Sequence, residues 1–186
     1  MSTYLLFHLT EKKENIIRVA LRLFANNGYV NTSTSKIAKV AGVSEGLIFR
    51  HFGNKQGLLD AIVDLGLKDA ETFVLQLTKI QDPKEVLSVA LELPKYLVGQ
   101  QQEFWQMHQS LKYQSPDLAE KYKSNDLFLK LTNVLEKAFK ELKYEHSKQE
   151  AALFLLVIGG LFSYMVNDRS EEHENMVNFV KSKYRL

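Results

Sequence analysis

The chain has 186 residues, and 45% of them are hydrophobic, which is enough for the core of one large domain or two small ones. It contains no cysteine, and this excludes disulfides, thiolate chemistry and metal sites that use cysteine ligands. The net charge is only +2, but the first 60 residues carry eight Lys or Arg and four acids, so the N-terminal end is modestly basic. That balance suits phosphate binding by this end, although many solvated surfaces have a similar charge.

Two segments bear on targeting and on membranes. The N-terminus lacks the basic region of a signal peptide and its apolar run is short, so we expect no such peptide. The longest apolar run, 151–166, has about 16 residues, whereas a helix that spans a bilayer needs roughly 20. The run therefore predicts a buried helix, with a membrane span as the alternative.

The first predicted helix runs from a cap at Thr10 to Gly28, because Ile17, Ala20 and Phe24 recur at helical spacing. Two short helices follow. Thr32 or Ser33 caps the first of them, and an apolar stripe of Ile37, Ala38 and Ala41 lies along it.

Gly42 then ends this helix, and Ser44 caps a second helical segment that ends at Phe52. This layout over about 33–52 is typical of a helix-turn-helix, in which the second helix can lie in the major groove of DNA. The alternative is a helical mini-bundle with no role in recognition.

The rest of the chain also predicts helices, since no segment alternates apolar and polar residues between turns. Their predicted starts are Asn54, Asp82-Pro83, Lys95 after Pro94, Ser115-Pro116-Asp117, the capping box Ser147–Glu150, and Glu171. We therefore expect an all-α fold of about nine helices. The predicted domains are 1–53, which holds the helix-turn-helix, and 54–186, a helical body.

Residues 20–62 carry a motif with many fixed points. The matching pieces are Ala20-x-x-Leu23-Phe24, Gly28-Tyr29, Thr32-Ser33, Ile37-Ala38, Ala41-Gly42-Val43-Ser44, Gly46, Phe52 and Lys55-x-x-Leu58-Leu59. In these pieces the chain from about 10 to 65 resembles the DNA-binding domain of the TetR (tetracycline-repressor-like) family of bacterial transcriptional regulators. The resemblance covers about a third of the chain and implies a homodimeric, ligand-responsive repressor on a palindromic operator.

Free N–H groups at the starts of the second, third and fourth helices suit phosphate oxygens, while side chains on the third helix can reach base edges. The predicted DNA-binding residues are Thr32, Ser33, Thr34, Ser44, Glu45, Gly46, Leu47, Phe49, Arg50, His51 and Lys55. Arg50 can read guanine or hold a phosphate.

Four of these positions depart from the commonest pattern of the family. Glu45 stands where Lys is frequent, so it either accepts from cytosine N4 or points away from the DNA. Leu47 replaces a frequent Thr and gains contact with a thymine methyl. Phe49 and His51 replace two frequent Tyr residues, and only His51 keeps a hydrogen bond to phosphate.

In the body, helix 148–166 is too apolar to face water, and one of its sides can pack on a partner chain. With the last helix it would complete a four-helix dimer bundle, as the resemblance implies. The expected interface residues are Leu153, Leu156, Val157, Gly160, Leu161, Tyr164, Met176, Phe179 and Val180. The alternative is a monomer in which this helix is internal.

The family usually binds an effector in the body, and one stretch here is rich in aromatic side chains. The candidate pocket residues are Phe104, Trp105, Met107, His108 and Tyr113. Such residues offer an apolar wall with polar handles for a small apolar or aromatic effector, but ordinary core packing is the favoured reading for any single one of them.

Two other classes of function fit the sequence less well. A small helical enzyme is disfavoured because the chain has no phosphate-binding loop, metalloprotease motif or nucleophile elbow, and its five histidines are scattered. A helical protein-interaction module would lack selective DNA binding. We therefore expect a cytoplasmic, non-enzymatic regulator with double-stranded DNA as its partner, and with no cofactor, metal or membrane contact.

Overall fold

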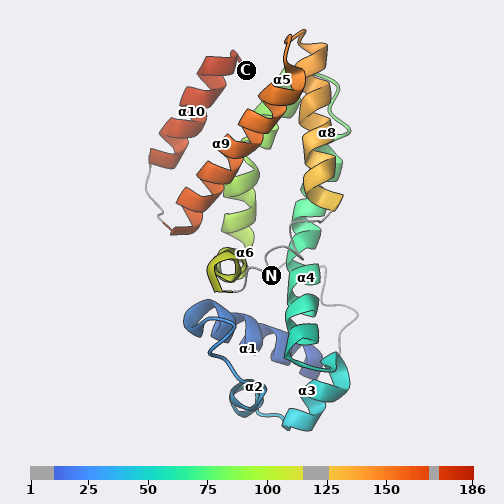
Figure 1. Cartoon of the computed structure of the whole chain (residues 1–186), viewed down its shortest axis with the longest axis vertical. Coiled ribbons are helices and arrows are strands. Elements are labelled where there is room, and N and C mark those ends of the chain that lie inside the picture. Colours follow the sequence, from blue (N-terminus) through green and yellow to red (C-terminus); the bar gives the residue numbers. More distant parts are fainter. Residues whose placement is uncertain (1–10, 115–125, 168–171) are drawn as a thin grey trace. The chain divides into compact units, whose positions relative to one another are not determined.

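The computed structural model describes residues 11–114, 126–167 and 172–186, apart from the side chains of 112–114, 167 and 172. The elements in these ranges are helices: α1 (Glu11–Asn27), α2 (Thr34–Ala41), α3 (Glu45–Phe52), α4 (Lys55–Leu77), α5 (Pro83–Ala90), α6 (Leu93–Gln114), α8 (Asp126–Glu141), α9 (Ser147–Asn167) and α10 (Glu172–Tyr184) (Figure 1). The all-α prediction is confirmed for them. The expected starts at Thr10, Ser115–Asp117 and Glu171, and the side chain of Tyr113, lie outside the described residues.

The chain divides into two compact units, and two helices pass from one to the other. The first unit contains the chain up to Lys68 and the segment that begins at Gln100, and the second contains Asp69–Gly99 and the C-terminal helices. The division falls inside α4 and close to Gln101, where the backbone of α6 leaves helical geometry with φ −145° and ψ 56°. The first unit is therefore larger than a domain that ends at residue 53.

In the first unit, α1, α2 and α3 share one apolar core. Ile16, Phe24, Ile37 and Ile48 have no exposed surface, and Asn15 Nδ2 donates to the carbonyl of Ala41 at 2.9 Å. The predicted apolar face of the first helix is confirmed, because Ile17, Ala20 and Phe24 are all buried.

In the second unit, α8 packs on α5 and α9, and α10 packs on α9. The rings of Phe139 and Phe154 lie edge to face, with centroids 5.5 Å apart, and Tyr184 contacts both. The Tyr184 hydroxyl donates to Glu150 at 3.1 Å. Burial and this carboxylate raise the pKa of Tyr184 to about 12. Glu150 thus ties α9 to α10.

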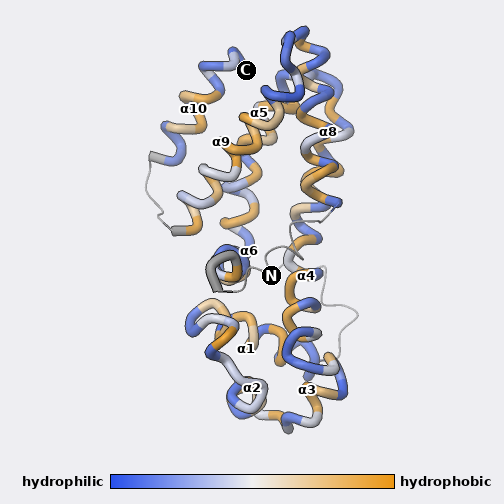
Figure 2. The backbone as a smooth tube through the Cα atoms, in the orientation of Figure 1, coloured by the Kyte–Doolittle hydropathy of each residue, from blue (hydrophilic) through white to orange (hydrophobic). Residues whose placement is uncertain are grey.

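Within this chain, helix α9 is buried on one face only, so it is not the fully internal helix of the monomer alternative. Ala151, Phe154, Ile158 and Leu161 form the buried face, whereas Leu156 is 73% exposed. Figure 2 shows apolar residues along most of α9. Among the described residues it is the one helix whose length and composition would allow it to cross a membrane, with a mean hydropathy of 1.6 over 147–166.

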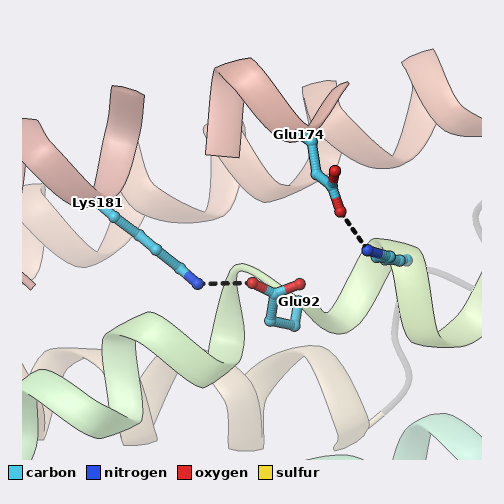
Figure 3. Close-up of polar contacts among 4 residues, drawn as sticks. Glu92, Glu174 and Lys181 are labelled. Atoms are coloured by element: carbon cyan, nitrogen blue, oxygen red, sulfur yellow. Dashed lines mark hydrogen bonds and ion pairs between the residues drawn. The ribbon is translucent and has the colours of Figure 1, made fainter. Parts of the chain in front are cut away.

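Two ion pairs hold α10 against the start of α6 and the residue Glu92 just before it (Figure 3). Lys95 Nζ lies 2.5 Å from Glu174 Oε1, and Lys181 Nζ lies 2.6 Å from Glu92 Oε1. Both pairs are partly or largely open to solvent, so water and salt screen them and they contribute little to stability. Their effect is to fix the register of α10.

His173 at the start of α10 is buried, and its Nε2 has no hydrogen-bond partner. Burial lowers its pKa; Lys95 lowers it further, whereas Glu92 and Glu174 act against the decrease. The folded state therefore holds a neutral imidazole, while the unfolded chain takes up a proton near pH 6.5.

We expect the free energy of unfolding to fall as the pH drops from 7 to 5, by at most about 1.4 kcal/mol per pH unit from this group. His173→Gln should flatten that dependence in denaturant titrations, because Gln does not titrate. His146→Gln, at an exposed position, is the control. Equal pH dependence in the wild type and His173→Gln would contradict this role for His173.

Candidate nucleic-acid interface

The α2–α3 unit is built by local caps. The Ser33 side chain accepts from the backbone N–H of Lys36, and Ser44 accepts from that of Leu47. Between the helices Gly42 has φ 67°, in the left-handed region that glycine adopts most readily, and its N–H donates to Ala38. The predicted helix-turn-helix at about 33–52 is thus present with its predicted caps.

Helix α3 has one inward face and one outward face. Ile48 is fully buried, and Leu47 and His51 are half-buried. On the outward face, Gly46 and Arg50 are exposed and Phe49 keeps 45% of its surface exposed. No neighbouring atom lies within 4 Å of a Cβ added at Gly46, so another molecule has room to approach the first turn.

Thr32 does not fit its expected role in DNA contact. It has no exposed surface, and its hydroxyl donates to the carbonyl of Gly28 at 2.8 Å, with the Leu23 carbonyl at 3.3 Å. The hydroxyl therefore stabilises the turn after α1 instead of facing outward. The sequence pattern could not show this, because a Thr before a helix is equally common as an exposed cap.

Thr34 and Glu45 form a contact between the first residues of α2 and α3. The Thr34 hydroxyl donates to Glu45 Oε1 at 2.5 Å, and both side chains are half-buried. The Glu45 carboxylate is thus held by α2 in this structure.

Lys55 begins α4 and is held close to the turn after α1. Its Nζ lies 4.3 Å from the centroid of the Tyr29 ring and 3.3 Å from the Val30 carbonyl. Burial lowers the pKa of Lys55, but an ammonium over an aromatic face remains a cation at neutral pH. The Tyr29 hydroxyl in turn donates to Gln56 at 3.1 Å.

A glycine that the sequence analysis passed over fixes the passage from α3 to α4. Gly57 N–H donates to the Asn54 side chain at 2.8 Å, which confirms Asn54 as the cap of α4. A Cβ at Gly57 would lie 2.0 Å from the Phe52 carbonyl oxygen. No signal at the level of one sequence separates this glycine from an ordinary helical one.

The candidate effector residues lie in a packed aromatic cluster of the first unit. Phe104, Trp105 and Met107 are buried, and the rings of Phe104 and Trp105 lie 4.7 Å apart with His108 beside both. A Cβ at Gly66 would lie 2.2 Å from the Phe104 ring, so α4 and α6 meet closely here. This tight packing agrees with the core-packing alternative.

An open groove of about 580 Å³ lies in the second unit, between α4 and α8. Val74, Leu75 and Val134 give it an apolar wall, and Glu71 and Lys130 lie along it. None of the predicted pocket residues lines it.

The candidate dimer residues fall into three groups by exposure. Leu153, Leu156, Met176 and Phe179 are between 47% and 73% exposed, whereas Leu161 and Val180 are only 5% exposed. Val157 and Tyr164 are half-buried, and the space beside Gly160 is open. Leu161 and Val180 therefore serve the core of their own chain, while Leu153, Leu156, Met176 and Phe179 remain exposed.

Comparison with known proteins identifies the N-terminal segment. Residues 16–62 match the profile of a family described as "Bacterial regulatory proteins, tetR family". The HTH-type transcriptional regulator AcrR of Shigella flexneri is 37% identical over 83 residues, which cover 45% of this chain and 38% of AcrR. The HTH-type transcriptional repressor Rv3405c of Mycobacterium tuberculosis is 35% identical over 99 residues, which cover 47% of this chain and 50% of the repressor. The chain thus spans half or less of these relatives.

Solved structures extend the likeness to the fold of nearly the whole chain. AibR, solved with isovaleryl coenzyme A and operator DNA, superposes with a TM-score of 0.69 at 21% identity, over 91% of this chain and 96% of AibR. At that identity the likeness shows the fold alone.

Proposed function

We propose that the chain, whose residues 16–62 match the family described as "Bacterial regulatory proteins, tetR family", is a dimeric, sequence-specific DNA-binding transcriptional regulator. The observation that carries the proposal is the capped α2–Gly42–α3 unit, which leaves Phe49 and Arg50 on an outward face. Such a helix fits the major groove. We propose repression as its mode, since one matching relative is named a repressor, and the cytoplasm as its location.

In the proposed complex, the interface separates into phosphate contacts and base contacts. The chain's phosphate contacts would come from Ser33, His51 and Lys55, together with N–H groups at the helix starts. Base edges would be read by Ser44 and Arg50, with Gly46 permitting close approach. Half-buried Leu47 leaves only part of its side chain for a thymine methyl.

The proposed dimer uses the outward faces of α9 and α10. Apolar side chains there are exposed, among them Leu156 and Phe179, and a monomer would leave this surface in water. The open space beside Gly160 lets a second helix approach closely. Two α3 helices related by a twofold axis would then read half-sites about one helical turn apart, or a multiple of it.

We further propose a small-molecule effector that changes the affinity for DNA. The support is indirect: AibR, which shares the fold, was solved with a coenzyme A ester as well as DNA. An effector would act by favouring a conformation in which the two recognition helices no longer match the operator. The aromatic cluster around Phe104 remains one proposed location, and no cofactor is required. We propose no catalytic activity, since the matching relatives are named as regulators.

Arg50→Ala is expected to weaken operator binding by about tenfold or more, because an Arg that reads a base contributes about 1–3 kcal/mol. The exposed side chain makes no core contact, so the fold should persist. Fluorescence anisotropy on operator duplex, with circular dichroism as the folding control, measures both. Unchanged affinity would remove Arg50 from the reading set.

Lys55→Ala is expected to weaken binding to operator and random duplexes about equally, and to reduce the salt slope by roughly one. A cation on a phosphate carries no base information, which is why both duplexes should respond alike. Anisotropy at several salt concentrations gives the slopes. A loss confined to the operator would assign Lys55 to base reading instead.

A further inference from the structure

The inference concerns Glu45 and rests on the proposed function. Glu45 is the only acid in the helix-turn-helix segment 33–52, which also holds Lys36, Lys39 and Arg50. It is the first residue of α3 and lies one helical turn before Phe49, on the side of the helix that faces outward. The N-terminal residues of a recognition helix are those that reach base edges.

The carboxylate is held in place by the neighbouring helix. Thr34 donates its hydroxyl to Oε1 at 2.5 Å, and hydrogen bonds to a charged acceptor are among the stronger ones in proteins. This bond uses the Thr34 proton inside the domain, so Thr34 is better described as a positioning residue for Glu45 than as a phosphate donor. Rotamers of Glu45 that swing into solvent lose this bond.

A carboxylate at a DNA surface discriminates between bases because it can only accept hydrogen bonds. It offers no donor, so it repels phosphates and finds no partner at guanine O6 and N7 or at thymine O4. Cytosine presents its N4 amino group in the major groove without an acceptor beside it on the same base, whereas the N6 amino group of adenine lies beside the N7 acceptor, which repels a carboxylate. Cytosine is therefore the natural match for Glu. The negative charge therefore disfavours every site except those that present an amino group at the matching base.

We propose that Glu45, oriented by Thr34, is a specificity-determining residue that requires cytosine in the operator half-site and lowers affinity for all other DNA. Specificity here comes from an unfavourable charge at wrong sites as much as from one hydrogen bond at the right site. The single acid in an otherwise basic segment thereby widens the gap between operator and random DNA.

The test compares the wild type with Glu45→Gln on duplexes selected from a randomised library by the wild-type protein. Glu45→Gln should bind random duplex several-fold more tightly than the wild type does. When the matching C·G pair is replaced by T·A, the wild type should lose roughly fivefold or more in affinity, whereas the affinity of Glu45→Gln should not fall. Glu103→Gln removes the same charge from an exposed position of α6, and it should behave as the wild type.

Variants at Thr34 test the positioning role. Thr34→Val should reduce the preference for cytosine, because the carboxylate loses its partner, and Thr34→Ser should restore it. Thermal melts of all variants check that the fold is kept. Equal loss in Thr34→Val and Thr34→Ser would contradict a role for the hydroxyl.

The outcomes separate this inference from the function on which it rests. If the wild type selects no sequence at all, the regulator proposal itself fails. If the wild type selects an operator but Glu45→Gln selects the same bases with the same affinity for random duplex, Glu45 is not a specificity determinant and the regulator proposal stands.

Discussion

Leu156→Glu is expected to convert the dimer into a folded monomer that no longer binds operator DNA selectively. Leu156 is 73% exposed on α9 and lies in the apolar face that we assign to the partner chain. A carboxylate there would be buried without a partner in the dimer, which costs several kcal/mol at each of two symmetric positions. In the monomer the same side chain would lie in water, so folding should be preserved.

Sedimentation or light scattering gives the mass, and anisotropy gives the operator affinity. Leu129→Glu is the matched control, since Leu129 on α8 is also largely exposed but lies outside α9 and α10. Leu161→Glu would not distinguish a lost dimer contact from unfolding, because Leu161 is buried in its own chain and a charge there would unfold the domain. A stable Leu156→Glu dimer would place the interface elsewhere.

Gly57→Ala is expected to lower the free energy of unfolding by about 1–3 kcal/mol, as overpacking does, and to weaken DNA binding with it. An added Cβ would lie 2.0 Å from the Phe52 carbonyl oxygen, a backbone atom that cannot rotate away. The first turn of α4 and the end of α3 would have to separate. Because α3 is the proposed reading helix, its orientation would change as well.

Denaturant titration and operator anisotropy measure the two effects of Gly57→Ala. Gly99→Ala is the control, since Gly99 also lies in a helix and nothing lies within 4 Å of an added Cβ there. Alanine at such a position should be neutral or stabilise by up to about 1 kcal/mol. A Gly57→Ala protein as stable as Gly99→Ala would show that α3 and α4 can move apart at little cost.

The sequence predicted those parts of the fold that depend on neighbouring residues. The caps at Ser44 and Asp82 and the break at Gly42 each arise within about three residues of chain, and the structure contains all of them. Ser147 is the first residue of α9 and not the cap before it, and Glu150 accepts from the hydroxyl of Tyr184. A residue 34 positions away decided that outcome, and no local pattern contains it.

In the candidate site, too, the features that depend on neighbouring residues were predictable and those that depend on tertiary packing were not. Arg50 on the outward face of α3 follows from helical spacing. The bond between Thr34 and Glu45 depends on the angle between two helices, and the burial of Thr32 depends on the turn after α1. On α9, periodicity placed Leu156 and Leu161 on one predicted face, whereas tertiary packing buries only Leu161.

The central claim is selective reading of DNA by α3 in a dimer, and one titration tests it most directly. Fluorescence anisotropy on a selected duplex and on a random duplex, at several salt concentrations, gives affinity, selectivity and stoichiometry together. We predict two protomers per selected duplex, affinity at least about a thousandfold above that for random duplex, and a steep salt slope. Equal, weak binding to both duplexes, or no binding at low salt, would contradict the claim.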